Sequence, residues 1–295
     1  PTLQALARSS HALVGVLTRP DRPAGRGRAL TASPIKLLAQ QLQLPLLQPD
    51  ELHSAPAHGA LQAWAPDLLV VVAYGLILPP SVLTLPRLGC INVHASLLPR
   101  WRGAAPIKRA ILAGDPQTGI TIMQMVAQLD AGPILAQQPL PIGPEASAGQ
   151  LQDQLAQLGA ATLLATLTEA QTARWQPQPQ SAQGVSYAAK IGKRDADIDW
   201  RAPAVEIDRR IRALNPTPVA QTLFRGQQLR IWQAQTLDAD SHGEAGEILG
   251  LEQERLLVQC GRGRLGLTRL QLAGRRVVSA REFVSAHGSA GLRLG

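Results

Sequence analysis

The sequence predicts an α/β protein with a doubly wound, mostly parallel sheet, followed by an all-β module at the carboxyl end. Two observations predict this class. In the first half of the chain, short apolar runs alternate with amphipathic segments, as strands and helices do in βαβ units. From about residue 221 onward, β-like runs follow one another with Gly and charged turns between them, which is typical of a small barrel. The 295 residues suffice for two domains.

The first elements begin directly at the amino end. Residues 1–10 are expected to form a helix with Pro1 in its first turn, and residues 14–18 a buried strand. A helix that leads into a buried strand predicts a further strand before Pro1, since a parallel sheet without it would expose unpaired backbone. Between residues 18 and 30, two Pro and two Gly argue against regular structure and indicate a mobile, cationic loop.

The alternation continues through the rest of the first half. The stretch 67–73 is an uninterrupted apolar run, which is typical of a strand covered on both faces. Apolar residues recur at helical spacing in the stretch 146–173. The expected helices are residues 34–41, 57–64, 105–113 and 146–173, and the expected strands are residues 44–47, 67–73, 90–94 and 119–125.

A polar stretch separates the two predicted domains. Residues 175–203 begin with a segment rich in Gln and Pro, which favours a linker between a domain at 1–174 and a domain at 204–295. The second domain is expected to open with a basic helix at 204–214. Its expected strands are residues 222–224, 228–234, 246–249, 256–260 and 265–272.

Composition and charge narrow the classes of function. The 29 Lys and Arg outnumber the 21 Asp and Glu, and the net charge of +8 suggests a polyanionic partner, although an Arg-rich composition alone produces the same charge. Cys90 and Cys260 lie far apart and outside any metal-ligand spacing, so neither a disulfide nor a zinc site is expected. No apolar run of about 18 residues predicts a membrane span. Without a visible targeting segment, a cytoplasmic location is expected.

Asn92 and His94 are the first candidates for chemistry. They alternate with Ile91 and Val93 along a strand, so both polar side chains point to the same side at its carboxyl end. Ligands of open α/β sheets bind at that end. An amide beside an imidazole can donate two hydrogen bonds toward one oxygen, which suits the oxyanion of an acyl transfer. The alternative is a structural role, because an isolated Asn-x-His is common.

Asp130 is the third candidate. It follows the strand expected at 119–125 and precedes Ala131-Gly132. Taken from the residues alone, an Asp in this position is usually a turn residue, because its side chain bonds to nearby backbone. Taken alone, the pattern therefore favours a turn residue, and a chemical role is the alternative.

The stretch from Cys90 to Gly103 resembles the formyltransferase family that uses 10-formyltetrahydrofolate. The shared features are Asn-x-His, a Ser-Leu-Leu-Pro loop and the following Arg-Gly. The resemblance implies that Asn92, His94 and Asp130 are the catalytic residues, the last from the family's Leu-Asp-Thr-Gly motif, in which Ala131 here replaces Thr. It also implies that the loop after residue 94 and the loop at 74–79 line the folate site. For the loop at 74–79, ordinary packing is an alternative. The implied folate-binding residues are Ser96, Leu97, Leu98, Pro99, Leu76 and Ile77.

The cationic loop resembles a feature of the branch of this family that acts on methionyl-tRNA. Residues 21–27, Asp-Arg-Pro-Ala-Gly-Arg-Gly, match an insertion loop that touches the acceptor stem in that branch. The resemblance implies that Arg26 is the leading tRNA contact, with Arg22 and Arg28 beside it, and guanidinium groups suit phosphates and base edges. It also implies a carboxyl-terminal domain that resembles an oligonucleotide-binding (OB) fold.

The resemblance implies a monomeric enzyme without a metal that moves the formyl group of 10-formyltetrahydrofolate to the amino group of methionyl initiator tRNA, for translation initiation. Three alternatives stay open: a formyltransferase for a sugar nucleotide or purine precursor, a folate hydrolase with water as acceptor, and an RNA-binding protein without catalysis. The Arg-rich stretch 19–28 and the basic β-module argue against the first alternative.

Overall fold

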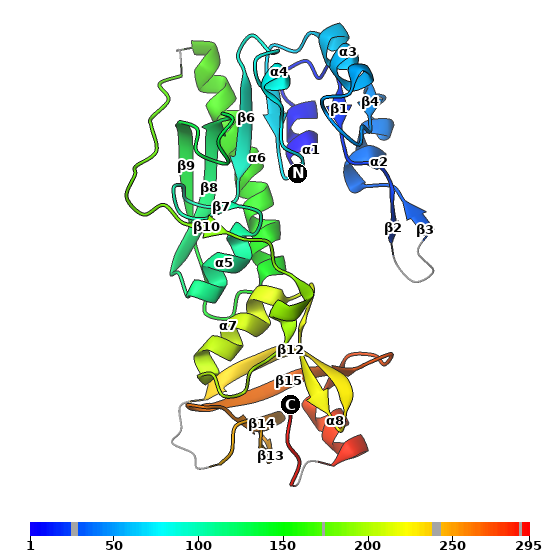
Figure 1. The fold of residues 1–295 in the computed structure, drawn as a ribbon, viewed down its shortest axis with the longest axis vertical. Helices are drawn as coiled ribbons and strands as arrows, with labels where there is room; N and C mark the ends of the chain where they lie inside the picture. The colour runs from blue at the N-terminus through cyan, green and yellow to red at the C-terminus, as the bar shows by residue number, and fades with distance from the viewer. Residues whose placement is uncertain (25–28, 173–174, 238–242, 289–290) are drawn as a thin grey trace. The chain divides into compact units, whose positions relative to one another are not determined.

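The computed structural model describes residues 1–24, 29–172, 175–237, 243–288 and 291–295 (Figure 1). The chain divides into two compact units. The first unit comprises Pro1–Ala104, Thr118–Leu140 and Asp153–Ala188, and the second comprises Ala105–Gln117, Pro141–Gln152 and Ala189–Gly295. The three candidate catalytic residues all belong to the first unit.

The amino-terminal part of the first unit follows the predicted alternation. Its elements are α1 (Thr2–Ala7), β1 (Val16–Leu17), α2 (Pro34–Gln41), β4 (Leu46–Leu47) and α3 (Ala55–Trp64). β1 and β4 pair in parallel, with Val16 opposite Leu46. α2 begins as predicted, because the Ser33 hydroxyl accepts a hydrogen bond of 3.1 Å from the Lys36 N–H and Pro34 stands in the first turn.

The cationic loop has a regular stem. β2 (Arg22–Ala24) pairs antiparallel with β3 (Ala29–Thr31), and Pro23 lies opposite Leu30 in a hairpin that projects from the first unit (Figure 1). The prediction that residues 18–30 lack regular structure is wrong for these two strands. Each strand of a two-stranded ribbon has a free edge, so Pro can join without removing a ladder hydrogen bond. The tip at 25–28, with Arg26 and Arg28, lies outside the described residues.

A mixed sheet forms the centre of the first unit. Its strands lie in the order β5 (Leu69–Val71), β6 (Cys90–His94), β8 (Gln117–Gln124) and β9 (Ile134–Pro141), and α4 (Pro80–Leu83) precedes β6. β5 runs parallel to β6, whereas β8 runs antiparallel to it. The α/β class is confirmed, but pairing of β6 with β8 makes this sheet mixed.

The long helix α6 (Ala148–Thr172) supports β6 from behind. Leu155, Leu163 and Leu167 on this helix are buried, as the helical spacing predicts. Gly159 permits a close approach, because a Cβ atom there would lie 2.9 Å from Cγ1 of Val93. Val93 points to the opposite side from Asn92 and His94, so the helix packs on the side of β6 that faces away from these two residues.

A second parallel pair of strands lies in the first unit. β7 (Arg102–Gly103) pairs with β10 (Tyr187–Ala188), and Tyr187 lies opposite Arg102. The Arg102 N–H donates to the carbonyl of Ser186 at 2.9 Å, and the Ala104 N–H donates to the carbonyl of Ala188 at 2.9 Å. The chain on either side of residue 187 is therefore joined to the loop that follows β6.

The second unit contains an antiparallel β-module, as predicted. Its strands lie in the order β11 (Ala220–Phe224), β12 (Gln227–Leu237), β15 (Arg264–Leu272), β14 (Arg255–Gln259) and β13 (Ile248–Glu252), and β16 (Val278–Ser279) pairs with β15. Leu294 forms a bridge with Phe224 in β11, and Arg293 forms one with Glu247 beside β13. These bridges place the last residues of the chain beside β11 and beside the start of β13.

Helices cover the β-module and its surroundings. They are α5 (Pro106–Ala113), α7 (Ala204–Leu214), α8 (Ala280–His287) and the 3-10 turn η1 (Lys193–Ala196). Ile207 and Ile211 of α7 and Phe283 of α8 are buried in one cluster with Leu229 and Leu267 of the strands. Among the described residues, no helix is both long and apolar enough to cross a membrane.

Candidate active site

The candidate site begins at the carboxyl end of β6. Ile91 is fully buried and Val93 is nearly so, which fixes the strand and leaves Asn92 and His94 on the other side. In the pairing with β8, Asn92 lies opposite Met123 and His94 lies opposite Thr121. The His94 side chain is 6% exposed, so its environment is mostly protein.

Asp130 lies where the two polar side chains can reach it. Its Oδ2 accepts a hydrogen bond of 2.8 Å from the Gly103 N–H and lies 3.7 Å from Nδ1 of His94. Its Oδ1 accepts a bond of 3.4 Å from Nδ2 of Asn92. The backbone of Asp130 has φ +46°, a conformation that Asp tolerates better than most residues. The structure therefore brings the three residues together around one carboxylate, and their catalytic role stays a prediction.

The imidazole of His94 is held through both nitrogens. Nε2 lies 2.9 Å from the carbonyl oxygen of Trp101, which can only accept, so Nε2 carries a proton. Nδ1 faces the Asp130 carboxylate and forms an ion pair with it only when the ring is protonated. Nδ1 is therefore the nitrogen that can take up or release a proton in this arrangement.

Cys90 lies on the same side of β6 but does not offer a nucleophile. Its thiol is 3% exposed and contacts the carbonyl of Val82 at 3.6 Å. Burial raises the pKa of the thiol to about 11, so the thiolate that would attack a substrate is scarce at neutral pH.

Within the described ranges, no group of three or more His, Cys, Asp or Glu side chains could hold a metal ion.

The loop after β6 is fixed from inside. The Thr121 hydroxyl donates to the carbonyl of Ser96 at 2.7 Å and accepts from the Leu98 N–H at 3.1 Å. The Gln137 amide donates to the carbonyl of Leu98 at 2.9 Å, and the Ser96 hydroxyl donates to the carbonyl of Arg100 at 2.6 Å. Because the side chains of Ser96 and Leu98 are buried, this rim can offer a ligand its backbone and the half-buried Leu97 and Pro99.

The second predicted folate loop is less uniform. Leu76 is partly buried and packs in the cluster that contains Leu78 and Cys90. Ile77, in contrast, is 86% exposed. Leu76 therefore has a packing role in this structure, whereas Ile77 is free to meet a ligand.

Comparisons with known proteins match two consecutive parts of the chain. Residues 2–167 match the family described as formyl transferase, and residues 190–288 match the family described as formyl transferase, C-terminal domain. The chain belongs to the formyl transferase family. A methionyl-tRNA formyltransferase of Methylococcus capsulatus is 50% identical over 295 residues, which are 100% of this chain and 96% of that protein.

Two solved structures share the fold of this formyl transferase. One is HypX from Aquifex aeolicus in complex with tetrahydrofolic acid, with a TM-score of 0.62, 18% identity, and coverage of 83% of this chain and 43% of that chain. The other is the N-formyltransferase from Helicobacter canadensis with folinic acid and dTDP-3-aminofucose, with a TM-score of 0.64, 15% identity, and coverage of 90% and 93%. At these identities the likeness concerns the fold alone.

The sequence did not reveal which backbone groups complete the site of this formyl transferase. The N–H of Gly103 and the carbonyl of Trp101 hold Asp130 and His94, and backbone groups leave no side-chain signature. Gly103 itself offers one signal. Its φ is +108°, and a Cβ atom there would lie 3.2 Å from the carbonyl oxygen of Ala188, so the position requires Gly.

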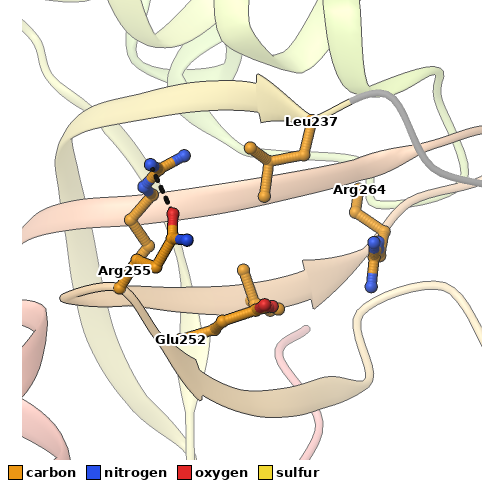
Figure 2. Close-up of a pocket in the computed structure, with 6 residues that line it drawn as sticks. Leu237, Glu252, Arg255 and Arg264 are labelled. Atoms are coloured by element: carbon orange, nitrogen blue, oxygen red, sulfur yellow. Dashed lines mark hydrogen bonds between the residues drawn. The ribbon is translucent and has the colours of Figure 1, made fainter.

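A hollow in the second unit is separate from these residues. It has a volume of about 190 Å³ and is lined by Leu237, Glu252, Gln253, Arg255, Leu257 and Arg264 (Figure 2). Arg255 donates to the Gln253 side chain at 3.2 Å, which the dashed line in Figure 2 marks. The charges of Glu252 and the two arginines partly offset one another, and no candidate catalytic residue lines the hollow.

Gly132 should not accept a side chain. A Cβ atom there would lie 1.8 Å from the carbonyl oxygen of Gln124, so Gly132→Ala must displace the turn that carries Asp130. We expect it to lower kcat about 100-fold, because small displacements of catalytic groups have effects of this size. Gly59→Ala is the control, since a Cβ there meets nothing within 4 Å. A wild-type kcat for Gly132→Ala, measured in a formyl-transfer assay, would contradict this view of the turn.

Thr121 should act on folate binding. Thr121→Val keeps the shape of the side chain but leaves the Leu98 N–H without its partner, a loss of about 1–3 kcal/mol. We expect the Kd for tetrahydrofolate, measured by calorimetry, to rise about tenfold. Thr118→Val is the matched control on β8, because the Thr118 hydroxyl is buried without a hydrogen-bond partner. Equal effects of the two variants would argue against the loop as the folate rim.

Proposed function

We propose that this formyltransferase moves the formyl group of 10-formyltetrahydrofolate to the amino group of methionyl initiator tRNA, with Asn92, His94 and Asp130 as its catalytic residues. The observation that supports the proposal most strongly is that the Asn92 amide, the His94 imidazole and the Gly103 N–H all face the Asp130 carboxylate. The methionyl-tRNA formyltransferase of Methylococcus capsulatus, which is 50% identical over the full length of this chain, supports the choice of acceptor.

The reaction joins an amine to a formyl carbon. The amine nitrogen forms a new C–N bond, the formyl oxygen becomes an alkoxide, and the bond from carbon to the folate nitrogen then breaks. Since α-amino groups titrate near pH ~8, part of the acceptor is already neutral and needs little activation. The enzyme must chiefly align the two substrates and stabilise the alkoxide.

Asn92 suits the alkoxide. Its Nδ2 makes only a long bond of 3.4 Å to Asp130, so it can turn toward a substrate oxygen at little loss. An amide donor placed at a developing oxyanion is worth about 100-fold in rate. Asn92 is half-buried, which leaves it within reach of a ligand.

Asp130 and His94 suit the proton transfers. The amine must lose a proton, and the departing folate nitrogen must gain one. The Asp130 carboxylate is oriented by the Gly103 N–H at 2.8 Å and can accept the proton of the amine directly or through water. Nδ1 of His94, 3.7 Å from that carboxylate, can hold the proton until the folate nitrogen receives it. The folate leaves neutral and no proton is left over.

Arginines support an RNA acceptor. Arg22 is exposed at the start of the β2–β3 hairpin, and we propose that it contacts the acceptor stem together with Arg26 and Arg28 of the tip. We also propose a catalytic domain at 1–174, a linker at 175–203 and a tRNA-binding domain at 204–295. A monomer in the cytoplasm, without a metal, suits this role in translation initiation.

Competition between acceptors tests the proposal. The protein is incubated with 10-formyltetrahydrofolate and one of three acceptors: charged initiator tRNA, a dTDP-linked amino sugar, or water alone. We expect formylmethionyl-tRNA and little product from the sugar. Formylation of the sugar without that of the tRNA would favour a small-molecule formyltransferase. Release of formate without an amine would indicate a folate hydrolase, and no turnover at all would leave an RNA-binding protein.

A further inference from the structure

Gln180 lies in the segment that the sequence assigns to a linker, yet its side chain reaches the candidate site. Its Nε2 donates to the carbonyl oxygen of Asp130 at 2.8 Å and to that of Gly132 at 2.9 Å. Its Oε1 accepts two hydrogen bonds from the guanidinium of Arg102, at 2.7 Å from Nη2 and 3.0 Å from Nε. One amide therefore joins the turn of Asp130 to the residue before Gly103.

Arg102 fixes the orientation of that amide. Arg102 is only 7% exposed, and its Nε and Nη2 both donate to the Gln180 side chain. A guanidinium can only donate, so it must face Oε1, and Nε2 must then face the two carbonyls, which can only accept. The donors of Arg102 on one side and the two carbonyl acceptors on the other thus fix which end of the Gln180 amide faces each.

The same segment also holds the loop on the other side of the site. The Trp101 N–H donates to the Ser186 hydroxyl at 3.0 Å, and the Arg102 N–H donates to the Ser186 carbonyl at 2.9 Å. These bonds fix the backbone that presents the Trp101 carbonyl to His94 and the Gly103 N–H to Asp130. Residues 180–188 therefore hold in place the backbone groups that contact His94 and Asp130.

We propose that Gln180 is a positioning residue for formyl transfer, which holds the turn at φ +46° so that the Asp130 carboxylate faces Asn92 and His94. The inference rests on the catalytic role proposed for Asp130. A non-Gly residue with positive φ persists only where its surroundings hold it, and the Gln180 amide provides two of the hydrogen bonds that do so. Without them the turn relaxes, and a shift of about 1 Å in a catalytic group lowers the rate about 100-fold.

Two variants separate positioning from stability. Gln180→Glu keeps the acceptor for Arg102 but removes the amide donors to the two carbonyls. Gln180→Met removes both. Gln183→Met is the matched control, because this nearby side chain is exposed. Melting temperature, kcat and the KM values for folate and tRNA are measured, and activity is assayed per folded molecule well below each melting temperature.

We expect the kcat of Gln180→Glu, per folded molecule, to fall at least about tenfold while both KM values stay within about twofold, since a displaced Asp130 would weaken contacts to the transition state and leave substrate binding intact. Its melting temperature should fall less than that of Gln180→Met, because the carboxylate still accepts from Arg102 although it no longer donates to the two carbonyls. Gln180→Met should lose both kcat and thermal stability, because buried Arg102 then lacks its acceptor. Gln183→Met should match the wild type.

A wild-type kcat in Gln180→Glu and Gln180→Met would overturn the inference, as would a loss confined to KM or to the melting temperature. Asp130→Ala is assayed beside them. If that variant is impaired and the Gln180 variants are not, only the role of Gln180 is wrong. If Asp130→Ala turns over like the wild type, the catalytic assignment fails and the positioning role fails with it.

Discussion

Asp130→Ala is expected to lower kcat at least about 100-fold while tetrahydrofolate binds as in the wild type, because the variant removes the group that we propose orients His94 and accepts the proton of the amine. The carboxylate contacts Asn92, His94 and the Gly103 N–H at the same time. Steady-state formylation of charged initiator tRNA measures kcat, and calorimetry measures the Kd for the folate.

Two comparisons sharpen that test. Asp130→Asn keeps an acceptor for the Gly103 N–H but removes the negative charge, so a loss as large as that of Asp130→Ala assigns the effect to the charge. Asp153→Asn removes a carboxylate from an exposed position on α6 and should leave turnover unchanged. Wild-type kcat in Asp130→Ala would show that another group carries the proton.

Asn92→Ala is expected to lower kcat about 100-fold with little change in either KM, since the amide is proposed to act on the oxyanion, which is absent from the bound substrates. The half-buried position lets water fill the space, so the free energy of unfolding should change little. Kinetic constants and a urea denaturation curve measure both expectations.

Gln128→Ala is the control for Asn92→Ala. It also removes an amide from the neighbourhood of Asp130, but its side chain is exposed. If Asn92→Ala raised KM and left kcat unchanged, the amide would bind the substrate in its ground state, and the assignment of Asn92 to the oxyanion would be wrong.

The elements that the sequence predicted best have strong local signals. α2 has a Ser cap and a Pro in its first turn, and in β6 the apolar Ile91 and Val93 alternate with polar residues. The strand β9 was missed, because two Pro and two Gln in Ile134–Pro141 weaken the apolar pattern and its place in the sheet depends on tertiary pairing. The helices α4 and α8 were missed as well, and α4 is too short to show a helical period.

The candidate site was predictable only in part. The period of two along β6 placed Asn92 and His94 on one side without further information. Asp130 required the family resemblance, because the pattern around it equally describes a turn. Gln180 could not be found, since it lies 50 residues beyond Asp130 and its bonds go to backbone carbonyls and to one arginine.

The environment of the cysteines has a consequence for how this enzyme responds to oxidants. The chain has two cysteines, and both are buried. Burial raises the pKa of Cys90 to about 11 and that of Cys260 to about 12, so both remain thiols at neutral pH. Peroxide and alkylating reagents react with exposed thiolates. We therefore expect thiol-directed alkylating reagents to leave formyl transfer by the folded enzyme unchanged, because neither cysteine offers an exposed thiolate.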